Sequence, residues 1–445
     1  MRFTDARATA SVCTPTRYAL LTGRYAWRKP GTGILSGEAP LIIETNRATL
    51  PSMLKQAGYT TGVVGKWHLG LGVKKTEYNS RVAPGPREAG FDYSFIIPAT
   101  GDRVPCVFVE NGRAVGLDPA DPIRVSYAKT NNPFPGEPTG RDPGVKLKIK
   151  ADDQHSDSVV NGISRIGFMT GGNAARWVDE EIPDTLVAKS VKFIEQSRKQ
   201  PFFLYFATHD IHEPMVPNAQ FKGTSKIGTR GDGIQQFDWQ VGQILAALDR
   251  LNLSSNTLVI VSSDNGATLG SRYEYEDKAV FHRQPPNGNL RGGKGTLYEG
   301  GHREPFLARW PGHISAGATR GDLIGLVDTL AACAALTGQS LGDQDAPDSF
   351  NFLPALLGEK IDKPIRDQLV LQNNNQRPLA LREGNWKLIE PDAPRDGKPV
   401  SFELYNLAND LSETNNLAAS QPDKVKALSA RLEQLQAVKS TRLMK

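Results

Sequence analysis

Near the start of the chain, Cys13 stands in a pattern that could support nucleophilic chemistry. Residues 13–17 are Cys-Thr-Pro-Thr-Arg, and Leu-Leu-Thr-Gly-Arg follows shortly after. Pro15 suits the first turn of a helix, where its missing N–H costs nothing, so Cys13 is predicted at a helix N-terminus. Backbone N–H groups and the helix dipole favour an anion there and lower the pKa of a thiol. The alternative is a small buried cysteine before a helix, the commoner setting of a free cysteine.

Two further clusters place basic side chains directly after apolar runs. Lys66 and His68 lie in Gly-Lys-Trp-His-Leu-Gly. The lysine offers a cation to anionic oxygens, and the histidine can transfer a proton. The alternative is a solvated lysine beside a packed Trp-His pair. His209 and His212 lie in His-Asp-Ile-His-Glu-Pro. Two histidines three residues apart could bind a transition metal, but no third soft ligand accompanies them.

Two stretches with glycines add further polar groups. Asp264 and Asn265 follow an apolar run in Ser-Ser-Asp-Asn-Gly, and their oxygens suit a hard cation such as calcium. The alternative is a plain Asp-Asn-Gly turn. Lys294 lies in Arg-Gly-Gly-Lys-Gly-Thr, which partly matches a phosphate-binding P-loop. That motif requires Ser or Thr directly after the lysine, and Gly295 excludes it.

The elements that must position these residues alternate along the chain. Short runs rich in aromatic and β-branched residues predict strands at 60–64, 202–207 and 257–262. Helical spacing of apolar residues predicts helices at 184–196 and 237–251. The alternation predicts an α/β fold with a mostly parallel central sheet flanked by helices. Ligands bind beyond the carboxyl ends of such strands, which is where the polar clusters stand.

Two regions depart from this alternation. Residues 74–172 are rich in Pro and Gly and are expected to form a long excursion of loops. Short strand-like pieces and a final helix predict a C-terminal α+β subdomain with an antiparallel sheet. The predicted domains are therefore 1–365 and 366–445. The predicted pieces of the second are 369–372, 379–382, 386–390, 403–406 and a helix at 422–438.

Composition excludes several classes of protein. The 445 residues carry a formal net charge of +5 with scattered basic residues, which does not indicate a nucleic-acid partner. No apolar run approaches the length of a membrane span. The three cysteines form neither a disulfide framework nor a zinc pattern.

The order of the motifs carries a family resemblance. Cys-x-Pro-x-Arg followed by Leu-Thr-Gly-Arg resembles the signature of the type I sulfatases, within the alkaline phosphatase superfamily. The other clusters follow in family order along most of the chain. The resemblance implies that Cys13 is oxidised to formylglycine (3-oxoalanine), whose hydrate supplies the nucleophilic oxygen. It also implies that Arg17 steadies the charged nucleophile and the metal site.

The same resemblance implies roles for the basic clusters. Lys66 and His68 match residues of the family's site, and His212 matches a histidine that contacts the sulfate. Lys294 matches a lysine that contacts the sulfate near the leaving oxygen. His209 is expected to line the same pocket.

For the metal, the resemblance is incomplete. Asp264 and Asn265 match a pair that holds calcium in the family, with magnesium as the alternative ion. Family members also begin with a buried strand that ends in two adjacent aspartates, which this chain lacks before Cys13. Asp152 and Asp153 are adjacent but lie in the predicted loops, so the role does not pass to them. Either a truncated gene or a shortened paralogue would explain the difference.

The implied function is hydrolysis of a sulfate ester on a sulfated small molecule or glycan, with a formylglycine-generating enzyme as a partner. Two alternatives remain open: a phosphoester or phosphonate ester hydrolase of the same superfamily, and an inactive sulfoglycan-binding remnant. The expected location is periplasmic or secreted, although the chain itself shows no signal segment.

Overall fold

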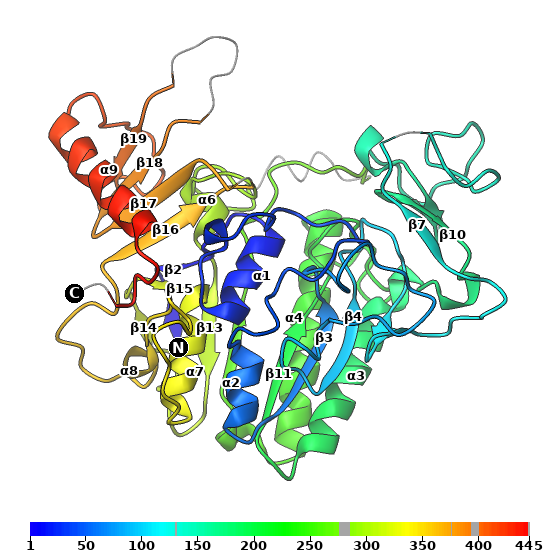
Figure 1. The fold of residues 1–445 in the computed structure, drawn as a ribbon, viewed down its shortest axis with the longest axis horizontal. Coiled ribbons are helices and arrows are strands. Elements are labelled where there is room, and N and C mark those ends of the chain that lie inside the picture. The colour runs from blue at the N-terminus through cyan, green and yellow to red at the C-terminus, as the bar shows by residue number, and fades with distance from the viewer. Residues whose placement is uncertain (130, 276–284, 375, 393–399, 444–445) are drawn as a thin grey trace.

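The structure, a computed structural model, describes residues 1–129, 131–275, 285–374, 376–392 and 400–443 (Figure 1). Its main sheet has the strand order β11-β3-β4-β5-β6, and β11, β3 and β4 run parallel. These strands are β3 (Thr60–Lys66), β4 (Tyr93–Ile97), β5 (Val109–Glu110), β6 (Arg113–Ala114) and β11 (Phe202–Ala207). The predicted strands at 60–64 and 202–207 are thereby confirmed.

A second sheet has the order β12-β13-β1-β14. Its strands are β1 (Arg2–Phe3), β12 (Val259–Ser262), β13 (Phe306–Arg309) and β14 (Thr319–Arg320), and β13 runs antiparallel to both of its neighbours. The third predicted strand is thus present but begins at residue 259. Within the described ranges β11 and β12 are edge strands of their sheets, and their apolar side chains are mostly half-buried.

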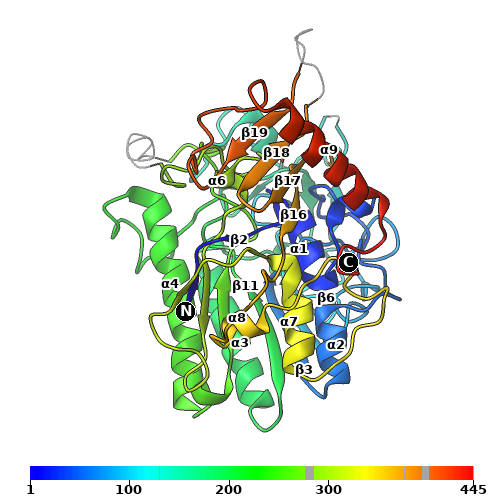
Figure 2. The ribbon, with the colours of Figure 1, turned by 90° about the vertical axis from the view of Figure 1, so that its left-hand side faces the viewer.

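Helices cover both faces of the strands, as Figure 2 shows. On one face lie α3 (Ile182–Ser197) and α4 (Gly228–Arg250), which pack against each other, and α3 contacts β3 and β11. On the other lie α1 (Cys13–Thr22), α2 (Leu50–Gln56) and α7 (Thr329–Leu336). The α/β prediction is confirmed. Both predicted helices begin earlier than expected, and glycines in the first turns of α4 conceal its start.

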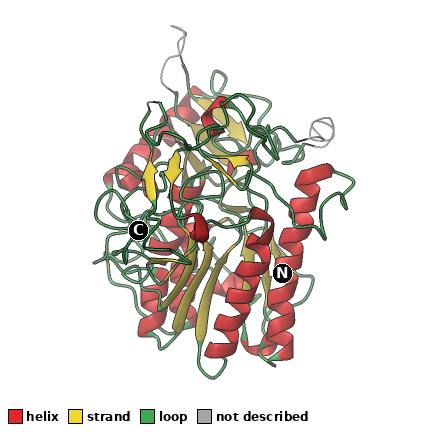
Figure 3. Cartoon of the chain, turned by 90° about the vertical axis from the view of Figure 1, so that its right-hand side faces the viewer, coloured by secondary structure: helices red, strands yellow, loops and turns green. Residues whose placement is uncertain are grey.

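The expectation of loops throughout 74–172 is wrong where the main sheet includes this range, at β4, β5 and β6. Strand β4 lies inside this range and pairs with β3 along its whole length. The remainder is mostly loops with short pairs, visible on the side seen in Figure 3. These pairs are β7 (Arg124–Ser126) with β10 (Phe168–Thr170), and β8 (Val159–Val160) with β9 (Ile163–Ser164).

The C-terminal subdomain is an antiparallel sheet covered by one helix, as predicted. The sheet order is β16-β17-β18-β19, and Leu428, Leu432 and Leu435 of the helix are buried in the core cluster that these strands share. Its elements are β16 (Gln368–Gln372), β17 (Leu379–Glu383), β18 (Trp386–Ile389), β19 (Glu403–Asn406) and α9 (Pro422–Ala437). In Figure 1 it lies above the second sheet, beside α6 (Glu299–His302).

Candidate active site

The helix α1 begins at Cys13, as the position of Pro15 predicted. Its first turn is fixed by side-chain hydrogen bonds, because the Thr16 hydroxyl donates to the carbonyl of Ala10 at 2.7 Å and the Thr14 hydroxyl to that of His68 at 3.0 Å. The second bond ties this turn to the end of β3. The Cys13 thiol therefore lies at a helix N-terminus that faces the carboxyl end of the sheet.

Lys66 is the cation next to this thiol. It ends β3, and its Nζ lies 3.0 Å from Cys13 Sγ, while Asn265 Oδ1 lies 3.4 Å from the same sulfur. Gly65 allows the strands to approach here, since its φ is +106° and a Cβ atom would lie 1.9 Å from the carbonyl oxygen of Ala207. Only glycine tolerates both conditions. The glycine before the lysine thus has a structural purpose.

Arg17 links the elements around the site. Its Nε donates to Asp264 at 2.7 Å, and its Nη1 donates to the carbonyl of Lys66 at 2.7 Å and to the Tyr205 hydroxyl at 3.2 Å. The side chain is 8% exposed. Arg17 therefore fixes α1 against β3, β11 and the segment after β12. Tyr205, inside an apolar strand, gave no sequence signal of this contact.

Lys294 and His212 form a second pair. Lys294 Nζ lies 3.2 Å from His212 Nε2, and the Lys294 backbone N–H donates to the carbonyl of Ala267 at 3.0 Å. His212 Nδ1 lies 2.6 Å from the carbonyl oxygen of Glu213 and 3.2 Å from the Thr100 hydroxyl. The carbonyl oxygen can only accept a hydrogen bond. The proton of the neutral ring therefore belongs on Nδ1, and Nε2 accepts from the lysine.

The charges of these groups are strongly coupled. Burial raises the pKa of the Cys13 thiol, but the positive charges of Lys294 and Lys66 bring that pKa well below its ordinary value. Burial lowers the pKa of Lys294, yet its attraction to Cys13 leaves the pKa raised overall. Burial and the two lysines lower the pKa of His212. The lysine keeps its proton at neutral pH, and the histidine stays neutral.

The other two predicted histidines are buried and neutral. Burial lowers the pKa of His68 to about 4 and that of His209 to about 3. His68 Nε2 contacts the carbonyl of Leu35 at 3.0 Å, while His68 Nδ1 and His209 Nε2 have no hydrogen-bond partner among the described residues. The His209 ring lies 6.4 Å from that of His212.

A cluster of polar residues around Asp102 adjoins the site and was not predicted from the sequence. The Thr100 hydroxyl that contacts His212 also donates to Asp102 at 2.5 Å. Asp102 pairs with Arg103 at 2.6 Å and with His155 at 3.4 Å. Asp102 and His155 are buried, and they come from the region that composition marked as loops. Single polar residues in such a region carry no periodic signal, so only the fold reveals their association.

Comparison with known proteins decides the family. A family model described as Sulfatase matches residues 1–339. The chain belongs to the formylglycine-type sulfatase family. An N-acetylgalactosamine-6-O-sulfatase of Bacteroides thetaiotaomicron is 46% identical over 97% of this sulfatase and 85% of its own length. Human arylsulfatase A is 31% identical over 99% of this chain and 80% of its own length.

A solved structure agrees with these relatives. It comes from work on the metabolism of multiple glycosaminoglycans by Bacteroides thetaiotaomicron and has a TM-score of 0.93 at 45% identity. The similarity covers 98% of this sulfatase and 92% of the solved chain. The enzyme class predicted from the sequence, a sulfuric ester hydrolase, is therefore confirmed, and the α/β fold is that of the family.

Members of this family use a divalent metal, and the candidate ligands here are Asp264 and Asn265. Their donor types fit a hard cation, and Asn265 Oδ1 lies beside Cys13 Sγ. Their number does not fill a shell of six to eight oxygens. Within the described ranges no group of three or more His, Cys, Asp or Glu side chains is arranged to hold a metal ion. The rejected pair Asp152–Asp153 is engaged elsewhere, with Asp152 bonded to His155.

The two other cysteines are chemically quiet. Burial raises the pKa of the Cys106 thiol and that of the Cys333 thiol to about 12. The structure thus brings together all the residues that the motifs singled out, and Cys13 alone among the three thiols lies between lysines. In the described part of the chain, no helix has the length and apolar character that spanning a membrane requires.

Proposed function

We propose that this sulfatase hydrolyses a sulfate ester of a sulfated glycan, with 6-O-sulfated N-acetylgalactosamine as the sugar. The observation that carries the proposal is the placement of Lys66 Nζ at 3.0 Å from Cys13 Sγ, beside the Lys294–His212 pair. A doubly anionic transition state needs fixed cations and donors, which this arrangement supplies. The substrate class follows from the 46% identical relative, which is an N-acetylgalactosamine-6-O-sulfatase.

As a formylglycine, residue 13 supplies a hydrated aldehyde, of which one hydroxyl attacks sulfur and the other later expels sulfate. The thiol itself lacks this route, because a thiosulfate ester has no second hydroxyl. Lys66 and Lys294 bind the sulfate oxygens, and Arg17 holds the first turn of α1 in place. His68 and His209, both neutral, offer ring nitrogens to the same oxygens.

The leaving oxygen takes its proton from Lys294. Burial and the two lysines lower the pKa of His212, so the lysine rather than the histidine carries the proton at neutral pH. His212 orients it, since its Nε2 accepts from Lys294 Nζ.

Calcium, with magnesium as the alternative, is the proposed metal, and Asp264 and Asn265 are the ligands that these residues contribute. The ion would polarise the sulfate. A formylglycine-generating enzyme is the proposed partner, and a secreted or periplasmic location is the proposed setting. The domain boundary at residue 366 stays a prediction.

Co-expression with a formylglycine-generating enzyme tests the proposal. Mass spectrometry should find the change from thiol to aldehyde in the Cys13 peptide alone, with Cys106 and Cys333 unchanged. The product should release sulfate from 6-O-sulfated N-acetylgalactosamine faster than phosphate from a matched phosphate ester, and Cys13→Ala should abolish release. An active preparation with an unmodified Cys13 would refute the mechanism. Binding of the sulfated sugar without turnover of any ester would instead favour the alternative of an inactive sulfoglycan-binding protein.

A further inference from the structure

The segment that carries Lys294 (residues 291–301, here the Lys294 segment) is rich in glycine: Gly292, Gly293, Gly295, Gly300 and Gly301. Such a segment loses much backbone entropy when it is fixed, so a precise lysine position requires anchors. On the active-site side, the N–H of Gly295 donates to the carbonyl of Ser11 at 2.8 Å, and that of Lys294 to Ala267. On the opposite side, the segment is anchored mainly by contacts with the C-terminal subdomain.

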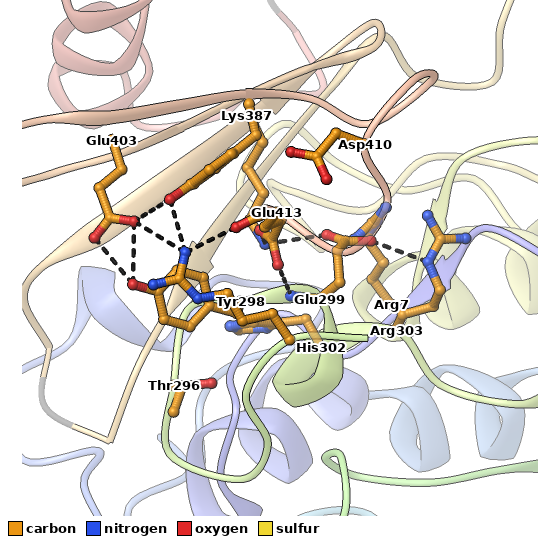
Figure 4. A network of polar contacts seen from close by, with 12 residues as sticks. Arg7, Thr296, Tyr298, Glu299, His302, Arg303, Lys387, Glu403, Asp410 and Glu413 are labelled. Atoms are coloured by element: carbon orange, nitrogen blue, oxygen red, sulfur yellow. Dashed lines mark hydrogen bonds and ion pairs between the residues drawn. The ribbon is translucent and has the colours of Figure 1, made fainter. Parts of the chain in front are cut away.

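The first of these anchors is Arg291. Its Nη1 donates to the Tyr405 hydroxyl and to the carbonyl oxygen of Glu413, each at 2.8 Å. The guanidinium lies 3.8 Å from the centre of the Tyr298 ring, and the Tyr298 hydroxyl donates to Glu403 at 3.0 Å. Figure 4 shows these contacts on one side of the network. They attach both ends of the glycine-rich stretch to the subdomain.

The second anchor is a buried ionic group around Glu299. Its N–H donates to Glu413 Oε2 at 2.6 Å, and its carboxylate contacts Lys387 at 3.0 Å and Arg7 at 2.5 Å. Lys387 Nζ also lies 2.7 Å from Glu413 Oε1, and all four side chains are 0% exposed. In Figure 4 these side chains converge beneath the loop of Glu413. Charges buried this fully are retained only when each has its partner.

Glu413 takes part in both anchors and has an unusual backbone. Its φ is +52°, in the left-handed region that residues other than glycine rarely adopt. In this conformation its carbonyl oxygen accepts from Arg291 while its carboxylate accepts from the backbone of Glu299. Strained residues persist where the surroundings impose them, often beside functional sites.

We propose that Glu413 is a positioning residue for Lys294: through Arg291 and Glu299 it holds the Lys294 segment against the active site. The role of Lys294 in turnover rests on the proposed function, but the holding of the segment does not. The C-terminal subdomain thereby contributes to the placement of Lys294. Loss of the anchor frees the glycine-rich backbone, and the lysine then spends less time at its distance from His212.

The variants are Glu413→Ala, which removes the carboxylate, and Glu413→Gln, which keeps an acceptor for the N–H of Glu299. The matched control is Asp328→Asn, which breaks the equally buried pair of Asp328 with Arg366 away from this segment. Should the alanine variant fail to fold, Glu413→Gln combined with Lys387→Met removes both charges together. Hydrogen exchange of the peptide covering 291–301, kcat and KM are measured for each.

Glu413→Ala should speed exchange in 291–301 and lower kcat about tenfold with a smaller change in KM, since a misplaced group costs mainly in the transition state. Glu413→Gln should restore part of both effects. In a Lys294→Ala background the Glu413 substitution should cost little further kcat, because both act through one lysine. The Asp328 control should leave exchange in this peptide unchanged.

An equal loss of kcat with and without Lys294 would overturn the proposal, because Glu413 would then act only on stability. Unchanged exchange in 291–301 would overturn it as well. If the unaltered protein hydrolyses no sulfate ester, the proposed function fails. The exchange comparison between Glu413 and Asp328 variants still decides whether the subdomain holds the segment.

Discussion

Replacing Lys66 by methionine tests the electrostatics of the site in its simplest form. The substitution keeps most of the apolar stem and removes the charge 3.0 Å from Cys13 Sγ. Both residues are 2% exposed, so solvent screens the pair little. At an effective dielectric constant of about 20 the attraction is about 5.5 kcal/mol. Because Lys294 remains nearby and also attracts the thiolate, we expect the pKa of the Cys13 thiol to rise when Lys66 is lost but to keep part of its lowering.

The assay is a titration of thiolate absorbance in the ultraviolet, on protein made without a formylglycine-generating enzyme. Cys106 and Cys333, whose pKa values are about 12, stay protonated through the range, so the signal belongs to Cys13. Subtracting a Cys13→Ser variant removes the tyrosine background. The unaltered protein should show a thiolate at neutral pH, and Lys66→Met should show it only at higher pH.

The same shift predicts how stability depends on pH. The pKa of Cys13 is lower in the folded than in the unfolded protein, where it is near the ordinary value of 9.0. Deprotonation therefore favours folding. The stabilisation is complete above pH 9.0 and is lost as the pH falls through the lowered folded-state value. Lys66→Met should lose most of this dependence. If Cys13 titrates identically in Lys66→Met and in the unaltered protein, the reasoning is refuted. The control is Lys189→Met, which removes a lysine from a partly exposed ion pair with Glu110.

Other substitutions make separate tests. Lys294→Ala should lower kcat about a hundredfold or more, as the loss of one positioned charge does, and an unchanged rate would place the pocket elsewhere. His212→Asn should remove the fall in rate at acidic pH. In the unaltered enzyme this fall occurs below the lowered pKa of His212, where the protonated ring can no longer accept a hydrogen bond from Lys294. A fall in rate that persists unchanged in the variant contradicts this. Gly65→Ala should lower the free energy of unfolding in urea by about 2–4 kcal/mol, since its Cβ would meet the carbonyl of Ala207. Gly58→Ala, with a positive φ but no atom within 4 Å, should cost less.

Local pattern was sufficient for the strands and helices that carry the motifs. Periodicity placed β3, β11 and the C-terminal sheet close to their observed ends, and Pro15 placed the start of α1 at Cys13. Residues 93–97 were missed, because five residues between Pro-rich stretches differ little from a loop until a neighbour strand pairs with them. The pairing of these residues with β3 depends on the tertiary structure and cannot be predicted from a short stretch of sequence.

The same limit applies to the site. Motifs supplied Cys13, Lys66 and Lys294 because glycine or proline beside them restricts the backbone in a recognisable way. Tyr205 and Asp102 were missed because each lies among ordinary neighbours and has a partner far along the chain. The partner is Arg17 for the tyrosine and His155 for the aspartate. Sequence patterns detect residues that constrain their own backbone better than residues that serve another side chain.

The arrangement divides acid–base work by burial and charge rather than by residue type. Histidine is usually the group that moves protons near neutral pH, yet burial beside two lysines keeps His212 neutral here. Lysine usually holds its proton too firmly to act as an acid. In the proposed mechanism, negative charge passes from residue 13 to the departing oxygen, and Lys294 would supply the proton to that oxygen. A neutral His212 is required throughout, since a second fixed cation on Nε2 would push Lys294 away from the position that the Lys294 segment maintains.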